Sequence, residues 1–143
     1  MSFLYIIRGL PGSGKTTLAR MLAERYRCNF YEADQYFEVD GEYKFDVSKL
    51  NAAHRQCFTQ TMADLAEGKD AIVSNTFTTL KEMRDYIECA MADDHLVHVI
   101  HCDREYGSIH NVPQKSIDRM KNRWLDNREL AKHYNYGITI CTY

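Results

Sequence analysis

Short apolar runs alternate with longer amphipathic segments along the whole chain. Five runs are short, apolar and rich in β-branched or aromatic residues, which is typical of strands. They cover residues 3–8, 29–33, 71–74, 95–102 and, as a possible extra edge strand, 138–141. Four segments place apolar residues three and four positions apart, which is the spacing of an amphipathic helix. They cover residues 15–26, 48–67, 79–91 and 114–127.

This alternation predicts an α/β fold: a three-layer sandwich around a mainly parallel sheet of four to five strands, joined by right-handed crossovers. Turn and cap residues punctuate the pattern. Asp40-Gly41 marks a turn inside the loop-like stretch 35–46, Asp46 or Ser48 can cap the helix after it, and Pro113 opens the last helix. No linker or repeat interrupts the chain, so we expect a single domain over residues 1–143.

Composition narrows the class without naming a function. The 143 residues are 45% hydrophobic and 27% charged, with a net charge of −2, as in an ordinary globular protein. This balance gives no general attraction to nucleic acid. No apolar run approaches the ~20 residues of a membrane span. The first apolar run stops at Arg8 without a basic region before it, so we expect neither a signal peptide nor a membrane partner, and a cytoplasmic location.

Cysteine and histidine contribute little to a functional hypothesis. The five cysteines are widely spaced and contain no C-x-x-C pair, so we expect buried small side chains in a reducing compartment. His95, His98 and His101 resemble a metal cluster in sequence. In a strand, however, the first and third point to one face and the second to the other, which argues against a zinc site.

The strongest motif is the run from Gly9 to Thr16, which matches G-x-x-x-x-G-K-[ST] in full. Glycines let the backbone wrap a phosphate, and the helix that follows presents its positive end to the anion. Lys15 supplies a charge for the outer phosphates, and the Thr16 hydroxyl can ligate Mg²⁺. The motif predicts a nucleoside triphosphate, ATP, bound with Mg²⁺ by residues that follow one another in the chain. They are Gly12, Ser13, Gly14, Lys15, Thr16 and Thr17.

Further runs give the chain a family resemblance from about residue 4 to residue 125. These runs are 32–37, 40–46, Ala53-His54, 74–77 and 109–113, followed by Met120 and Arg123-Trp124. With them the chain resembles small P-loop kinases of the polynucleotide 5′-hydroxyl kinase-like group, especially short and often phage-encoded members. The resemblance implies an Mg-ATP-dependent phosphotransferase that moves the γ-phosphoryl to a hydroxyl, in the host cytoplasm if the gene is a phage's.

The resemblance also implies roles for individual residues. The family's general base, an Asp at the end of the second strand, corresponds to Asp34, and a carboxylate beside Mg-ATP can orient a hydroxyl for in-line attack. Where the family has an Asp-Thr-Asn run for substrate positioning, this chain has Asn75, Thr76 and Phe77. Asn75 keeps a polar group without the charge. Tyr36 follows Asp34 closely and is a further candidate for acceptor contact.

The family's lid arginine has no counterpart in its usual place, where this chain has Gly107 and Ser108. Arg104, Arg119 and Arg123 remain as candidates, and Arg123 matches the family pattern best. If residues 114–127 form one helix, Arg119 and Arg123 share a face. We therefore expect these two arginines to close over the triphosphate and stabilise charge on the γ-phosphoryl oxygens.

Local charge is uneven. Residues 8–27 hold five basic residues and one acidic, whereas residues 32–46 hold six acidic residues and one basic. Residues 104–132 hold seven basic and four acidic residues. The basic segments surround the expected ATP side, and the acidic block lies beside the expected acceptor, where it would repel a long phosphate backbone.

Three functions therefore stay open. The first is transfer to a hydroxyl of a nucleic acid, a nucleotide or a modified base, with Tyr36, Phe37, Tyr43 and Phe45 as candidate acceptor contacts. The second is a small-metabolite or nucleoside kinase. The third is an ATPase or nucleotide-binding module without an acceptor, which the missing lid arginine favours. The sequence does not name the acceptor or the oligomeric state.

Overall fold

A parallel sheet forms the centre of the computed structural model, which describes residues 1–107, 111–134 and 136–143. Within them the main sheet has five strands in the order β2-β5-β1-β6-β7, and every neighbouring pair is parallel. The strands are β1 (Phe3–Arg8), β2 (Asn29–Tyr31), β5 (Ala71–Asn75), β6 (Leu96–His101) and β7 (Ile138–Thr142). The predicted edge strand is confirmed as β7, beside β6.

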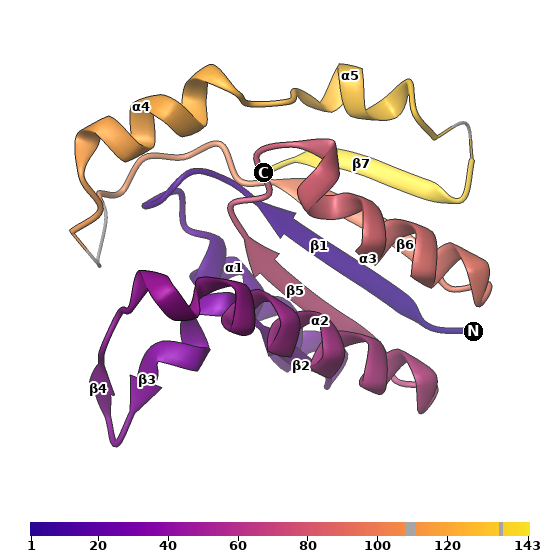
Figure 1. Ribbon diagram of the computed structural model, residues 1–143. Coiled ribbons are helices and arrows are strands. Elements are labelled where there is room, and N and C mark those ends of the chain that lie inside the picture. The colour runs from indigo at the N-terminus through magenta and orange to yellow at the C-terminus, as the bar shows by residue number, and fades with distance from the viewer. Residues whose placement is uncertain (108–110, 135) are drawn as a thin grey trace.

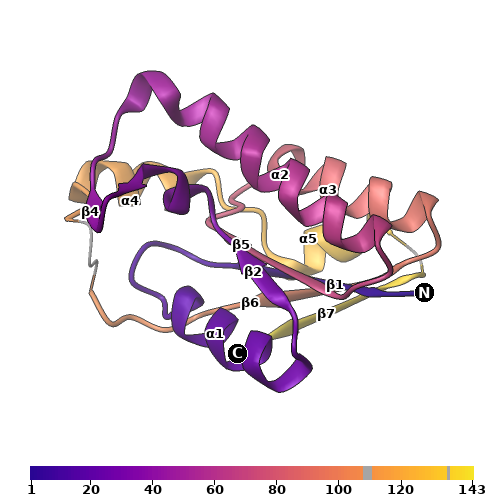
Figure 2. The ribbon, with the colours of Figure 1, turned by 90° about the horizontal axis from the view of Figure 1, so that it is seen from below.

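Helices cover both faces of this sheet, which confirms the predicted three-layer α/β sandwich. Figure 2 shows α1 (Lys15–Tyr26) on one face, with α2 (Leu50–Ala66) and α3 (Leu80–Ala92) on the other. Each strand is followed by a segment that crosses the sheet before the next parallel strand begins, as a parallel sheet requires. All five carboxyl ends therefore lie along the same edge (Figure 1).

Alternate residues of β1 divide the core into two parts. Leu4 and Ile6 point to the face under α2 and α3, and Tyr5 and Ile7 point to the face under α1. Within the described ranges, no helix is long and apolar enough to cross a bilayer. The expectation of buried cysteines holds for Cys57 and Cys102, while Cys28 is half-buried and the other two contradict it. Cys89 on α3 and Cys141 on β7 are exposed, because an amphipathic helix and an edge strand each leave positions in water.

The long loop predicted over residues 35–46 has structure of its own. A 3₁₀ turn, η1 (Ala33–Phe37), leads into a small hairpin of β3 (Glu38–Val39) and β4 (Glu42–Tyr43). At its tip Asp40 and Gly41 both have positive φ, as a two-residue hairpin turn demands. Asp46 then caps a second 3₁₀ turn, η2 (Val47–Lys49), by accepting from the Ser48 N–H, so that α2 begins only at Leu50.

The single helix predicted over residues 114–127 is wrong. It divides into α4 (Gln114–Asn122) and α5 (Asn127–Ala131), because the chain between them leaves the helix to donate from the Leu125 N–H to the Thr78 carbonyl. Asp126 caps the new helix by accepting from the Glu129 N–H. Trp124 therefore lies in the break, half-buried, rather than on a helix face.

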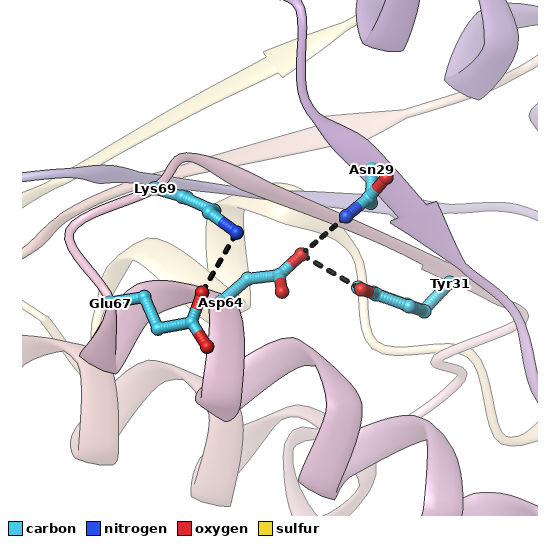
Figure 3. Close-up of polar contacts among 5 residues, drawn as sticks. All are labelled: Asn29, Tyr31, Asp64, Glu67 and Lys69. Atoms are coloured by element: carbon cyan, nitrogen blue, oxygen red, sulfur yellow. Dashed lines mark hydrogen bonds and ion pairs between the residues drawn. The ribbon is translucent and has the colours of Figure 1, made fainter.

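A polar network fixes the edge strand β2 to α2 (Figure 3). The Asp64 carboxylate accepts hydrogen bonds from Asn29 Nδ2 at 3.0 Å and from the Tyr31 hydroxyl at 2.8 Å. Burial, with the Asp64 charge beside it, raises the pKa of Tyr31 to about 12. The neighbouring Glu67–Lys69 ion pair is exposed and contributes little. The network joins both ends of β2 to α2, and so helps to position the acidic residues that follow this strand.

Candidate active site

The carboxyl ends of the strands bring together segments that are far apart in the sequence. The loop from Gly9 to Gly14 follows β1, Glu32 follows β2, and Asn75 ends β5. Cys102 continues β6 by donating from its N–H to the Arg8 carbonyl at 2.8 Å. In open parallel sheets, ligands bind at the carboxyl ends of the strands. The predicted site residues of the glycine-rich loop and Asn75 lie at these ends.

The glycine-rich loop has the backbone that its sequence predicts. Gly12 and Gly14 have φ of 80° and 89°, which a side chain would disfavour. A Cβ on Gly9 would lie only 2.4 Å from Ser13 Oγ and 2.8 Å from the Cys102 carbonyl oxygen. No side chain among the described residues caps the start of α1, so the N–H groups of its first turn face the loop, as an anion site requires.

Lys15 opens α1 and folds back over the loop. Its Nζ donates to the Leu10 carbonyl at 3.0 Å. Burial lowers the pKa of Lys15, although the nearby Glu32 carboxylate opposes this shift. A lysine held on a carbonyl in a partly dry site is ready to exchange that weak partner for phosphate oxygens.

A side-chain hydrogen bond joins Thr16 to Glu32. The Thr16 hydroxyl donates to Glu32 Oε2 at 2.8 Å. Burial raises the pKa of Glu32, while Thr16, Ser74 and Lys15 favour its charged form. Glu32 was not predicted as a site residue. The available signal was its position directly after β2, on the same edge as the glycine-rich loop.

Asp34 lies in the first turn of η1 and is exposed. Its Oδ1 accepts from the Tyr43 hydroxyl at 3.2 Å. Burial, reinforced by the Asp34 charge, raises the pKa of Tyr43 to about 12. The same charge also contributes to raising the pKa of Lys15, against its burial. Asp34 follows β2 as the glycine-rich loop follows β1, so both lie at the carboxyl ends of the parallel strands.

The residues at the end of β5 that are candidates for contact with the phosphate acceptor form hydrogen bonds to other elements. Asn75 Oδ1 accepts from the Ala33 N–H at 2.9 Å, and Asn75 Nδ2 donates to Cys57 Sγ at 3.6 Å. The Thr76 carbonyl accepts from the Gly9 N–H at 3.3 Å. Asn75 thus ties η1 to the sheet, and Thr76 ties the glycine-rich loop to β5.

A groove of about 880 Å³ opens between η1, the hairpin and η2. We call it the hairpin groove. Its lining mixes aromatic side chains with charged ones, and it consists of Tyr36, Phe37, Val39, Lys44, Phe45, Asp46, Val47 and Lys49. Phe37 is buried and packs against Tyr36, Tyr43 and Phe45 with ring centroids 5.1–6.3 Å apart. The other rings are thus fixed around it, beside Asp34.

The two candidate clamp arginines have different settings. Arg119 is exposed on α4, whereas Arg123 follows the end of that helix and donates from Nε to Thr78 Oγ1 at 2.9 Å. Of the two positions where the family's lid arginine is expected, Gly107 is described, whereas Ser108 lies outside the described residues. Beside them, the Tyr106 N–H donates to the Gly12 carbonyl at 2.7 Å, and the ring of Tyr106 lies against Gly14.

Arg8, at the end of β1, is completely buried, which the sequence gave no reason to expect. Its Nε donates to the Phe77 carbonyl at 3.0 Å and its Nη1 to Asn127 Oδ1 at 3.2 Å. The guanidinium stacks 4.1 Å from the centre of the Trp124 ring. Burial lowers the pKa of Arg8 to about 10, against the charges of Glu82 and Asp126. Arg8 therefore joins β1 to the break between α4 and α5.

The three histidines considered as metal ligands have separate neighbours. His95 Nδ1 accepts from the Ser2 N–H, His98 packs edge-on to the ring of Tyr5, and His101 lies against Trp124. No group of three or more metal-ligating side chains occurs in the part of the chain that the structure describes. At the glycine-rich loop the Thr16 hydroxyl is an oxygen that suits a hard cation, and the Glu32 carboxylate lies beside it.

The parallel sheet has β1 at its centre, and a glycine-rich loop joins β1 to α1. This arrangement defines a P-loop protein with a kinase-like fold. Residues 4–107 match the family described as an AAA domain, and the chain belongs to that family. The match covers the glycine-rich loop, η1, the hairpin and all strands except β7.

The chain is similar to parts of longer curated proteins. The chain is 33% identical over 132 residues to human NEDD4-binding protein 2, which covers 82% of this chain and 7% of that protein. It is 35% identical over 83 residues to shikimate kinase of Thiobacillus denitrificans, covering 50% of this chain and 44% of that enzyme. The chain thus spans less than half the length of these two relatives.

Solved structures share the fold at low sequence identity. Chaetomium thermophilum Kti12 in complex with ADP-AlF3 is 13% identical, with a TM-score of 0.66, over 98% of this chain and 89% of that one. A chain of the Pnkp1/Rnl/Hen1 complex is 19% identical, with a TM-score of 0.57, over 82% of this chain and 38% of that one. These likenesses show the fold.

Proposed function

We propose that the protein is an Mg-ATP-dependent phosphotransferase that moves the γ-phosphoryl group to a hydroxyl acceptor. One observation carries the proposal: Asp34 follows Glu32 by two residues at the carboxyl end of β2, and Glu32 is hydrogen-bonded to Thr16 of the glycine-rich motif. A phosphate-binding loop alone gives nucleotide binding, whereas a carboxylate beside it supplies the group that phosphoryl transfer to a hydroxyl needs.

In this proposal ATP binds along the glycine-rich loop. The backbone N–H groups of Gly12, Ser13 and Gly14 surround the β-phosphate, and those of Lys15, Thr16 and Thr17 continue the cradle into the first turn of α1. Lys15 Nζ leaves the Leu10 carbonyl for phosphate oxygens. The likeness to Kti12, whose structure holds ADP-AlF3, supports a nucleotide in this fold.

Mg²⁺ would bind through the Thr16 hydroxyl. The donors at this position are oxygens, which suit a small hard cation. When bound, the ion would neutralise the phosphate charge that develops during transfer. Thr16 orients the ion against the loop, and Lys15 balances the remaining phosphate charge.

Asp34 would act as the general base for the acceptor hydroxyl. It is exposed, so an acceptor can reach it, and the Tyr43 hydroxyl at 3.2 Å orients its carboxylate. The carboxylate accepts the acceptor's proton as the new O–P bond forms. The bond between the γ-phosphorus and ADP breaks on the opposite side, and ADP leaves. Asn75 supports this geometry through the Ala33 N–H, directly before Asp34.

The acceptor would lie in the hairpin groove, next to Asp34. Tyr36 and Phe45 offer ring faces on which a base can stack, and Lys44 and Lys49 offer charges for a phosphate. These features favour an acceptor on a nucleic acid, a nucleotide or a modified base, and the fold shared with a chain of the Pnkp1/Rnl/Hen1 complex supports the same class. The similarity to shikimate kinase favours a second candidate, a small-metabolite acceptor.

Arg119 and Arg123 are proposed to complete the site as a clamp on the γ-phosphoryl oxygens. Arg119 is exposed and able to move. Arg123 would exchange Thr78 Oγ1 for a phosphate oxygen, a charge-assisted and therefore stronger bond. We also propose that residues 1–143 act as one domain, because strands from both ends of the chain pair in one sheet.

A transfer screen tests the proposal. Radiolabelled ATP and Mg²⁺ are incubated with the protein and with 5′-hydroxyl oligonucleotides, hydroxymethyl-pyrimidine DNA, nucleosides or shikimate. We expect label on a polynucleotide or nucleotide acceptor and none with Lys15→Ala. Transfer to a small metabolite alone would favour the second candidate. Release of phosphate without any labelled acceptor would support an ATPase, and equal labelling by Lys15→Ala would overturn the proposal.

A further inference from the structure

We propose that Glu32 is the acid of the magnesium site: its carboxylate orients the Thr16 hydroxyl and accepts a hydrogen bond from water bound to the ion. Glu32 is thus a positioning residue rather than a direct ligand. The inference rests on the proposed function, because it concerns the same nucleotide site. It adds a residue that the glycine-rich motif does not contain and that follows a different strand.

The direction of the hydrogen bond is the first observation. The Thr16 hydroxyl donates its only proton to Glu32 Oε2 at 2.8 Å. A hydroxyl has one donor and two acceptor lone pairs, so this bond leaves both lone pairs directed away from Glu32. A cation can then take one lone pair without breaking the bond. Outer partners of this kind fix the orientation of a metal ligand and increase its basicity.

The strand order also places Glu32 beside the start of α1. Its strand β2 lies beyond β5, and β5 lies beside β1, so the carboxylate reaches past the end of β5 to the start of α1. At that end β5 carries Ser74 and Asn75, neither of which is charged. Ser74 is buried beside Glu32 and favours its charged form, although its Oγ makes no regular hydrogen bond.

The other acids at this edge of the sheet have different surroundings. Asp34 accepts from the Tyr43 hydroxyl on the hairpin side and is exposed. Asp103 follows β6 and is exposed. Glu32, by contrast, is half-buried and bonded to the residue of the motif that binds Mg²⁺.

Charge gives the arrangement a consequence that can be measured. Without a cation, the Glu32 carboxylate repels the triphosphate that Lys15 attracts. With Mg²⁺ between them, the same carboxylate stabilises the hydrated ion. Glu32 therefore couples the two ligands: it weakens ATP binding in the absence of Mg²⁺ and strengthens it in its presence.

Calorimetric titration of a non-hydrolysable ATP analogue, with Mg²⁺ and with EDTA, tests this coupling. Glu32→Gln keeps the size of the side chain and one acceptor for Thr16. We expect this variant to bind the analogue at least as tightly as the unaltered protein in EDTA, and about 10–100-fold more weakly with Mg²⁺. Glu38→Gln makes the same charge change at an exposed position of β3 and should leave both affinities unchanged.

Three results are decisive. An equal gain from Mg²⁺ in Glu32→Gln and in the unaltered protein would overturn the inference. A parallel loss of affinity with and without Mg²⁺, together with a lower melting temperature, would show a purely structural role and would also overturn it. If the unaltered protein bound no analogue under either condition, the proposed function itself would fail. That outcome is distinct from a loss of affinity that the variant shows only with Mg²⁺.

Discussion

Asn75 Oδ1 accepts a 2.9 Å hydrogen bond from the backbone N–H of Ala33, the residue directly before Asp34. The end of the β5 strand therefore sets the position of the proposed general base. The Asn75 amide nitrogen donates to Cys57 on α2, so one side chain joins the sheet, η1 and α2. The family resemblance implies that Asn75 contacts the acceptor. In the structure, its hydrogen bonds instead support the segment that carries Asp34.

We expect Asn75→Leu to lower both stability and transfer. The Ala33 N–H would lose its partner in a part-buried place, at a cost of about 1–3 kcal/mol. Because η1 carries Asp34, turnover should fall more than the affinity for ATP. Asn51→Leu, at an exposed position of α2, is the matched control. Thermal melting and steady-state transfer measure the two effects, and unchanged turnover in a destabilised Asn75→Leu would remove the link to Asp34.

Asp34→Asn should slow transfer by about 10²–10⁴-fold, which is the usual contribution of a general base. The amide keeps the hydrogen bond from Tyr43 but cannot take the acceptor's proton. Affinity for ATP should stay within a factor of about two, because loss of the base leaves the phosphate cradle intact.

Asp40→Asn is the control for Asp34→Asn. It removes an acid from the same block at the hairpin tip, where asparagine tolerates the positive φ. Both variants are assayed for ATP affinity and for turnover on the acceptor that the screen identifies. If ATP affinity collapses with turnover in Asp34→Asn alone, Asp34 is a metal or structural residue and not the base.

The affinity for ATP should depend on pH through Lys15. Burial lowers the pKa of Lys15 below its ordinary value of 10.5, so the free site begins to lose the lysine charge at a lower pH than an exposed lysine does. Phosphate favours the charged form and raises the pKa again. Affinity is therefore constant well below the lowered pKa and declines as pH rises through it, with proton uptake on binding.

Titrations of an ATP analogue from neutral pH to about pH 10.5 check this sign, with Lys15→Met as the control. That variant should bind weakly, and its residual affinity should be flat over the same alkaline range. An equal alkaline decline in both proteins would place the titrating group elsewhere.

The succession of strands and helices could be predicted from the sequence because its causes are local. Apolar runs bounded by glycine and helical spacing fix the elements, and the glycine-rich loop fixes which edge of the sheet binds a ligand. Gly9 shows how closely the motif reflects geometry, since any side chain there would meet Ser13 and the Cys102 carbonyl. Lys15, Thr16 and Asp34 accordingly lie at one edge.

The missed features depend on contacts between distant segments. Arg8 looked like the polar end of a strand, but the Phe77 carbonyl, Asn127 and the ring of Trp124 enclose it completely. Trp124 and Asn127 lie at the break after α4, whereas periodicity alone continued the helix to residue 127. Glu32 was hidden for the same reason: its partner Thr16 lies on another element, and only the strand order brings the two together.

That break also alters the expected clamp. Arg119 and Arg123 were predicted to share one face of a continuous helix, but α4 ends at Asn122 and the guanidinium of Arg123 is bonded to Thr78. Arg119→Ala should therefore lower turnover with little effect on melting. Arg123→Ala should lower the melting temperature as well, because the part-buried hydrogen bond from its charged guanidinium to Thr78 Oγ1 contributes about 1.5–3 kcal/mol.

The double variant decides whether the two arginines act on the same charge. If both guanidinium groups contact the γ-phosphoryl oxygens in the transition state, each can partly replace the other, and Arg119→Ala/Arg123→Ala should lose more turnover than the product of the two single losses. A loss of about 10²-fold or more is expected, as for removal of one group that stabilises transition-state charge. Arg128→Ala, exposed on α5, controls for the lost positive charge. Unchanged turnover in the double variant would leave no clamp from α4, and the ATPase or binding-module function would then explain the site better than a kinase.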